Sequence, residues 1–269
     1  MHLKRWLTSI VALPILFVLI LKGGRISFAI LIAIAALGAL WEYFRMVLPE
    51  GGKIIERFAT YPSLLVGPFI VWAVYCRSWY TLTGLLVLLL ICLAVFAIWR
   101  FEGSPIIFDE AARHITGIIY IPLFLSFLVA LRNSPSGVSW IFLLLAIVFA
   151  GDTAAFYTGS FLGRHKICPA VSPNKTLEGS IGGLVANVAV GALIKFIFFA
   201  EISWGVGIVL FIWIGIAAQL GDLFESVIKR SVGVKDSGVI LPGHGGILDR
   251  IDALIFAAPA TYFFKEFFL

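Results

Sequence analysis

A polar stretch near the end of the chain gathers most of the residue types that could perform chemistry. It runs from Ser226 to Asp252 and reads SVIKRSVGVKDSGVILPGHGGILDRID. Lys and Arg neutralise phosphate oxygens, glycines let backbone N–H groups approach an anion, and carboxylates hold Mg²⁺ that also binds substrate phosphates. The stretch therefore predicts polyphosphate chemistry. Its candidate residues are Ser226, Lys229, Arg230, Lys235, Asp236, Gly243, His244, Gly245, Gly246, Asp249, Arg250 and Asp252.

A simpler interpretation is a basic loop that contacts anionic lipid headgroups. That interpretation explains the cations. It explains neither the carboxylates of Asp249 and Asp252 nor the glycine-lined turn before them. Charge close to a membrane is costly, so a cluster of this kind is a functional-site hypothesis.

Helical spacing extends the cluster toward the N-terminus. Asp222, Glu225 and Lys229 stand at i, i+3 and i+7, and Ser226 and Arg230 continue the same stripe. Surface ion pairs are the alternative, but the stripe begins within apolar sequence.

Asp249 and Asp252 stand one turn apart where the last apolar helix is expected to begin, a place where the helix dipole alone favours carboxylates. The functional hypothesis pairs Asp249 with Asp222 as ligands of Mg²⁺. His244 is a further candidate in the turn before these carboxylates.

Two further elements precede this region. Asp152 lies within an apolar segment, where a carboxylate usually faces a polar cavity or a cation, although a bond to a neighbouring helix is the alternative. The loop that follows contains the string S-P-N-K-T-L-E-G. Its turn and its polar side chains suit a phosphate or headgroup contact; these are Ser172, Asn174, Lys175, Thr176 and Glu178.

The pattern S-x-x-x-K-R-x-x-x-x-K-D-x-x-x-x-x-P-G-H-G-G-x-x-D-R-x-D resembles the signature of the phosphatidate cytidylyltransferases, or CDP-diacylglycerol synthases. The string S-P-x-K-T-x-E-G resembles a second element of that family. The resemblance implies that CTP and phosphatidic acid give CDP-diacylglycerol and pyrophosphate. In that reaction His244 would bind phosphate or donate a proton to pyrophosphate. It also implies dependence on Mg²⁺, a second monovalent cation such as K⁺, and a homodimer. It covers roughly residues 151–255, and the first 130 residues match only as hydrophobic scaffold.

The elements that must position these residues are apolar segments. The chain has 269 residues and is 61% hydrophobic, well above soluble domains. This composition predicts an all-α, polytopic integral membrane protein with about nine transmembrane helices. The halves are expected to be a scaffold over residues 1–132 and a catalytic half over residues 133–269. The expected segments are Trp6–Leu21, Ile26–Trp41, Thr60–Cys76, Trp79–Trp99, Ile115–Leu131, Val138–Thr158, Ile181–Phe199, Trp204–Leu223 and Ile251–Phe268, the first two of which are short enough to form a hairpin that does not span fully.

Lys and Arg are distributed unevenly between the two ends of these segments. With nine spans and a cytoplasmic N-terminus, fourteen of the 20 Lys and Arg lie on the cytoplasmic side together with the active-site cluster. Lys195 lies inside a segment, and the opposite side holds Lys22, Arg25, Arg77, Arg132 and Lys265. This bias predicts an active site that faces the cytoplasm of a bacterial-type plasma membrane. The connector after Trp41 is expected to be solvated with a short helix at the membrane interface, and the connector from Arg100 to His114 is expected to be similar.

Other classes fit less well. The basic residues are scattered over short loops, so no nucleic acid is expected as a partner. Three cysteines without a CxxC motif give neither a disulfide framework nor a zinc signature. Two alternatives stay open. One is a CTP-dependent lipid kinase of the polyprenol or phytol type. The other is an ion-coupled transporter that uses Asp152, Lys195 and Asp222.

Overall fold

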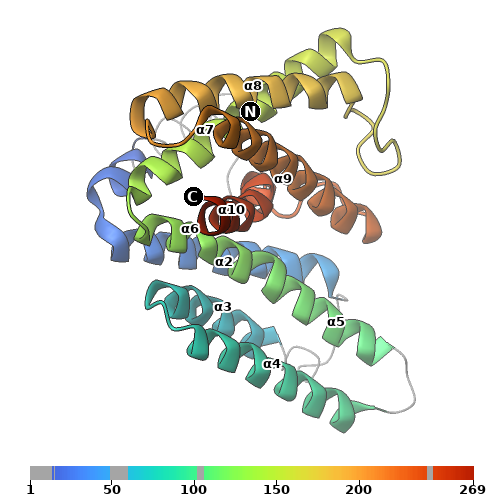
Figure 1. Cartoon of the computed structure of the whole chain (residues 1–269). Coiled ribbons are helices and arrows are strands. Elements are labelled where there is room, and N and C mark those ends of the chain that lie inside the picture. Colours follow the sequence, from blue (N-terminus) through green and yellow to red (C-terminus); the bar gives the residue numbers. More distant parts are fainter. Residues whose placement is uncertain (1–13, 15, 49–59, 102–105, 241–244) are drawn as a thin grey trace. The chain divides into compact units, whose positions relative to one another are not determined.

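The computed structural model describes residue 14 and residues 16–48, 60–101, 106–240 and 245–269, and these residues form an all-helical protein (Figure 1). Within them the strand-like pairing amounts to one isolated bridge, between Lys166 and Thr176. The helices are α2 (Gly24–Val47), α3 (Thr60–Tyr75), α4 (Trp79–Arg100), α5 (Ile106–Ile118), a π-helical turn η1 (Ile119–Leu123), α6 (Phe124–Asn133), α7 (Gly137–Leu162), α8 (Leu177–Phe198), α9 (Trp204–Ser231) and α10 (Leu248–Phe268).

Six candidate membrane spans are present in the described part of the chain. They are Gly24–Val47, Trp79–Arg100, Ile107–Asn133, Gly137–Leu162, Leu177–Phe198 and Trp204–Ser231. The apolar helix α3 has 16 residues and is shorter than a usual span. The expected segment Trp6–Leu21 lies mostly outside the described residues. The chain is therefore an integral membrane protein by its helices, whereas the expected count of nine spans is not confirmed.

The chain divides into two compact units. The first comprises residues 1–133 and 236–250. In it α2 packs against α3 and α6, with Leu40, Ile70 and Leu125 fully buried. Helix α5 continues through η1 into α6, and the wide turn accommodates Pro122, which cannot donate a backbone hydrogen bond. Residues 236–250 belong to this unit, although the sequence analysis placed them in the second half.

The described parts of two connectors that were expected to be solvated continue long helices and are partly buried. Helix α2 continues past Trp41 to Val47, and its Glu42, Tyr43 and Phe44 are buried. Helix α5 begins at Ile106, within the expected linker. Their charged residues predicted exposure to solvent. In the structure, apolar neighbours and polar contacts bury residues such as Glu42 within the first unit.

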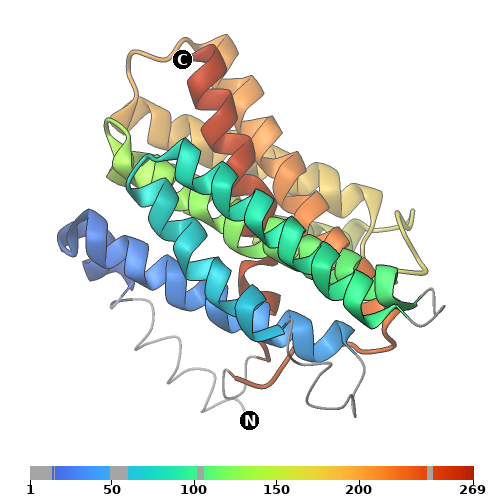
Figure 2. The same cartoon turned by 90° about the horizontal axis from the view of Figure 1, so that it is seen from below.

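The second unit comprises residues 134–235 and 251–269. Its helices α7 and α8 pack along each other, and α8 also packs against α9 (Figure 2). The buried residues of α8 recur every fourth position. They are Gly179, Gly183, Asn187, Gly191 and Lys195. Small residues at this spacing let helices approach closely.

Candidate functional site

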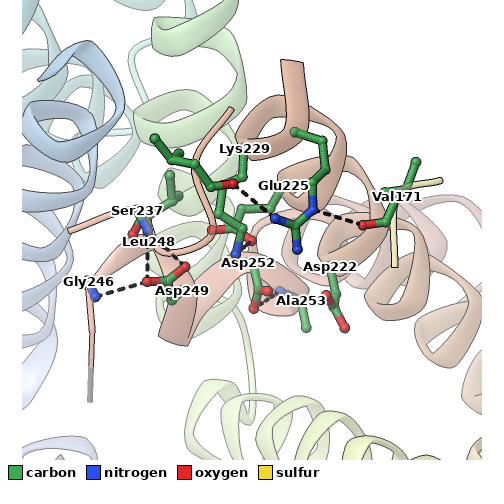
Figure 3. A network of polar contacts seen from close by, with 12 residues as sticks. Val171, Asp222, Glu225, Lys229, Ser237, Gly246, Leu248, Asp249, Asp252 and Ala253 are labelled. Atoms are coloured by element: carbon green, nitrogen blue, oxygen red, sulfur yellow. Dashed lines mark hydrogen bonds and ion pairs between the residues drawn. The ribbon is translucent and has the colours of Figure 1, made fainter. Parts of the chain in front are cut away.

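In the first unit, the carboxylate of Asp249 is held by backbone N–H groups (Figure 3). It accepts hydrogen bonds from the N–H of Ser237 at 3.0 Å and from the N–H of Gly246 at 2.9 Å. Gly245, with φ +85°, occupies a left-handed conformation that favours glycine. The sequence assigned the glycine N–H groups of this turn to phosphate. In the structure the N–H of Gly246 is used to hold Asp249.

A second carboxylate contacts the same Ser237 and the first residue of α10. Glu42 of α2 is 2% exposed, and its Oε2 accepts hydrogen bonds from the N–H of Leu248 at 2.9 Å and the hydroxyl of Ser237 at 3.3 Å. Sequence reasoning missed this residue, because it placed Glu42 in a solvated connector. The available signal was a carboxylate directly after a long apolar run, which in a membrane protein indicates a polar partner.

In the second unit, the predicted stripe on α9 exists and is engaged in ion pairs. Asp222 pairs with Lys175 of the loop before α8, with Oδ2 and Nζ 2.5 Å apart. Glu225 is fully buried and pairs with Lys229, one turn further along α9. A buried carboxylate is tolerated when such a cation neutralises it. The helix therefore presents the two carboxylates and then the lysine on the stripe that the sequence spacing predicted.

Three carboxylates of this unit lie close enough to influence one another. Asp252 interacts electrostatically with Asp222, Asp152 and Lys229, and Asp152 interacts with Asp222 and Lys175. Like charges repel, so such a grouping calls for a cation. The two lysines supply part of that charge.

The carboxylates around Asp222 are suitable ligands for Mg²⁺ only if other groups complete its coordination. In the described ranges, no group of three or more His, Cys, Asp or Glu side chains could hold a metal ion. Mg²⁺ usually needs only one or two protein carboxylates, since it keeps water and binds substrate phosphates. The carboxylates around Asp222 therefore fit a Mg²⁺ ion that binds together with phosphate groups, and they do not fit a closed protein cage.

The loop between α7 and α8 is ordered by its own polar side chains. Glu178 accepts hydrogen bonds from the backbone N–H of Arg164 at 3.0 Å and of His165 at 3.2 Å, and its Oε1 lies 2.6 Å from Nδ1 of His165. Thr176 is buried, and its hydroxyl accepts from the N–H of Gly179 as the N-cap of α8. Both residues had been assigned to substrate; in the structure they shape the loop that carries Lys175.

The other predicted residues lie around these contacts. Arg230 donates from Nε to the carbonyl of Val171 at 3.3 Å and from a terminal nitrogen to the carbonyl of Val234 at 3.1 Å. In the same loop the N–H of Lys175 donates to the carbonyl of Ser172. Ser226 is partly exposed on α9, and the exposed predicted residues are Asn174, Lys235, Asp236 and Arg250.

Comparison with known proteins decides the family. The sequence matches the cytidylyltransferase family over residues 3–268. The chain belongs to this family. It is similar to proteins named phosphatidate cytidylyltransferase from Bacillus subtilis (strain 168), with 32% identity over 98% of both chains, and from Staphylococcus aureus (strain COL), with 36% identity over 95% of both chains. A protein of the same name from Staphylococcus haemolyticus (strain JCSC1435) is 36% identical over 95% of both chains.

For this cytidylyltransferase family member, two predicted site residues lie outside the described residues. They are Gly243 and His244. Their assignments stay predictions from the sequence. Lys195, which the transporter hypothesis used as part of an ion relay, is buried with its ammonium 4.3 Å from the centroid of the Trp204 ring. A cation–π contact accounts for this lysine without a relay.

Proposed function

We propose that the chain transfers a cytidylyl group from CTP to phosphatidic acid, which gives CDP-diacylglycerol and pyrophosphate in phospholipid biosynthesis. The observation that carries the proposal is similarity to phosphatidate cytidylyltransferases along nearly the whole chain. The polar residues of Ser226–Asp252 supply the charges that this reaction needs. Neither the lipid kinase nor the transporter alternative has comparable support.

In the proposed reaction, an oxygen of the lipid phosphate attacks the α-phosphorus of CTP. A new oxygen–phosphorus bond forms, the bond between the α-phosphorus and the bridging oxygen breaks, and pyrophosphate leaves with the electron pair. The attacking oxygen is already anionic near neutral pH. Catalysis therefore depends on orientation and on neutralisation of charge rather than on a strong base.

The cationic side chains have distinct places in this proposal. Lys229, Arg230, Lys235 and Arg250 bind the triphosphate, the lipid phosphate and the leaving pyrophosphate. Lys175 lies against Asp222, so it would orient that carboxylate and add positive charge beside the phosphate groups. Asp222 and Asp249 are proposed as ligands of Mg²⁺, and a K⁺ ion is a possible second cation. When bound, Mg²⁺ neutralises phosphate charge during the transfer.

The membrane setting completes the proposal. The six candidate spans support an integral membrane enzyme whose lipid substrate arrives from the bilayer. The uneven distribution of Lys and Arg supports a cytoplasmic N-terminus and a cytoplasmic active site, where CTP is found. A homodimer is proposed from the family resemblance. A count of about nine spans is proposed from hydropathy.

The test is a conversion assay in detergent micelles with phosphatidic acid, Mg²⁺ and CTP labelled at the α-phosphorus. The wild type is expected to move the label into a lipid that co-migrates with CDP-diacylglycerol. Asp249→Asn is expected to lose about 99% or more of this activity, because loss of a group that stabilises transition-state charge typically costs about a hundredfold or more. Asp109→Asn, at an exposed position of α5, is the matched control and is expected to behave as wild type.

The outcomes separate the hypotheses. Labelled lipid formed by the wild type and not by Asp249→Asn supports both the reaction and the role of Asp249. Full activity in Asp249→Asn removes that residue from the site but leaves the reaction intact. Label that reaches a lipid only from γ-labelled CTP indicates a kinase. Folded wild-type protein that turns over no nucleotide contradicts the proposed function.

A further inference from the structure

We propose that Glu42 of α2 is a positioning residue for Asp249, and that it acts through its two hydrogen-bond donors, Ser237 and Leu248. The proposal rests on the proposed function, in which Asp249 belongs to the reaction centre. Glu42 has no place among the residues predicted from the sequence. Its hydrogen-bond donors Ser237 and Leu248 belong to the same unit as Glu42.

The first observation is the chain of hydrogen bonds that joins the two carboxylates. Oε2 of Glu42 accepts from the N–H of Leu248 at 2.9 Å and from the hydroxyl of Ser237 at 3.3 Å. The N–H of the same Ser237 donates to Asp249 at 3.0 Å. Ser237 therefore bridges Glu42 and Asp249, and Leu248 is the residue directly before Asp249. A shift of the Glu42 carboxylate must therefore move both Ser237, which donates to Asp249, and Leu248, which precedes it.

The second observation is the close fit of the backbone around Glu42. A Cβ atom added at Gly238 would lie 2.5 Å from Oε1 of Glu42, and one added at Gly246 would lie 2.5 Å from Oε2. Only glycine allows the backbone to approach the carboxylate this closely. Gly238 is thus explained by Glu42, and Gly246 by Glu42 together with the Ser237 hydroxyl oxygen, which would lie even closer to the added Cβ atom.

The third observation extends the contact along α2. Gly38 stands one turn before Glu42, and a Cβ atom there would lie 2.6 Å from Cδ1 of Ile247. Positions i and i+4 share one face of a helix. This face of α2 therefore receives Ile247 at Gly38 and the backbone of Leu248 at Glu42, and it is shaped to hold the start of α10.

Burial explains why the contact is strong enough to position Asp249. Glu42 is 2% exposed and Leu248 is fully buried. A buried carboxylate is costly unless donors compensate it, so Ser237 and Leu248 cannot move away from Glu42 without leaving a buried carboxylate unpaired. Displacement of a reacting group by about 1 Å can cost about a hundredfold in rate. Glu42 thereby restricts Asp249 without touching a substrate.

The test compares Glu42→Gln with Glu42→Asp. Both hydrogen bonds end on one oxygen, so glutamine, which keeps the length and an acceptor oxygen, is expected to retain most of the contact. Aspartate keeps the charge but is one methylene shorter and cannot reach Leu248. We expect kcat to fall about 10- to 100-fold in Glu42→Asp and less than about fivefold in Glu42→Gln, with KM for CTP changed less in both.

Amide hydrogen exchange gives a readout that does not depend on activity. The amides of Ser237 and Leu248, followed in the peptides that contain them, are expected to exchange about tenfold faster in Glu42→Asp than in wild type, while peptides from α4 stay unchanged. Glu110→Gln is the matched control: Glu110 belongs to the same unit but pairs with Arg100 at 2.8 Å. It is expected to change neither exchange nor kcat.

A reversed order of activities, with Glu42→Asp active and Glu42→Gln inactive, would mean that the charge itself matters and would overturn the positioning role. Unchanged exchange in both variants would also overturn it. If the Glu42 variants do not fold, Gly238→Ala tests the same contact, because the added Cβ atom would push against the Glu42 carboxylate. This variant must show faster exchange of the Ser237 and Leu248 amides and a reduced kcat. A wild type without cytidylyl transfer contradicts the proposed function, and exchange still tests the contact.

Discussion

At the scale of single residues, Lys175 and Asp222 form the contact most open to a direct test. They lie 2.5 Å apart, and both side chains are about a third exposed or less. If Lys175 acts by orienting Asp222, then Lys175→Met and Asp222→Asn should not have additive effects. We expect each variant to lose at least about tenfold in kcat/KM for CTP, and the double variant to be about as active as Asp222→Asn alone.

A kinetic double-mutant cycle measures this coupling. Lys166→Met is the control, because Lys166 is an exposed lysine of the same loop. Effects that simply multiply in the double variant would show that Lys175 binds a substrate phosphate independently of Asp222. A coupling equivalent to about tenfold, or about 1.4 kcal/mol, is the expected result.

Residue types and spacing predicted part of this site. The stripe from Asp222 to Lys229 followed from helical periodicity alone, since i, i+3 and i+7 positions share a face. Glu42 could not be found in that way, because its partners Ser237 and Leu248 lie about 200 residues away in sequence. Thr176 shows the opposite difficulty: the sequence indicates a hydroxyl near a lysine, but only the fold shows that the hydroxyl caps α8.

At the scale of elements, the glycines of α8 determine how closely three helices approach. A Cβ atom at Gly183 would lie 2.9 Å from the backbone oxygen of Gly151 in α7 and 3.3 Å from Nε2 of Gln219 in α9. Gly183→Ala must therefore separate the helices despite the higher helix propensity of alanine. We expect a loss of about 1–3 kcal/mol in the free energy of unfolding.

Thermal unfolding in detergent measures the effect as a lower midpoint. Gly84→Ala in α4 and Gly205→Ala in α9 are matched controls, because nothing lies within 4 Å of their added Cβ atoms. Both are expected to be neutral or slightly stabilising, since alanine favours a helix by up to about 1 kcal/mol over glycine. A midpoint for Gly183→Ala that matches the controls would show that α8 has room to move.

Hydropathy predicted the helices well and their ends poorly. The segment expected at Ile26–Trp41 is part of a helix that continues to Val47. The prediction ended it too early because Glu42 and Arg45 interrupt the apolar run and resemble a solvated boundary. In the same way, α5 begins within a stretch whose charges suggested a linker. Charged residues end an apolar run in a hydropathy profile, whereas a helix continues wherever its backbone hydrogen bonds and its buried neighbours allow.

At the scale of the whole molecule, two native cysteines report on the orientation in the membrane. Cys76 follows α3 and is exposed, and Cys168 lies in the loop between α7 and α8. Three of the candidate spans separate them: Trp79–Arg100, Ile107–Asn133 and Gly137–Leu162. An odd number of crossings puts the two cysteines on opposite sides, whether or not the N-terminal segments cross. With the cytoplasmic orientation proposed from the excess of Lys and Arg, Cys168 is predicted to lie in the cytoplasm.

Variants that retain a single cysteine, treated with a membrane-impermeant maleimide on intact cells, measure this arrangement. Cys76 is expected to react in intact cells, and Cys168 only after permeabilisation. Cys92, within the apolar helix α4, is the control and is expected to react poorly in both conditions, because a maleimide needs a thiolate in water. Equal labelling of Cys76 and Cys168 in intact cells would mean that one of the three helices does not cross. Reversed labelling would keep the crossings but place the loop that carries Lys175 outside, away from cytoplasmic CTP, and would contradict the proposed function at the same time.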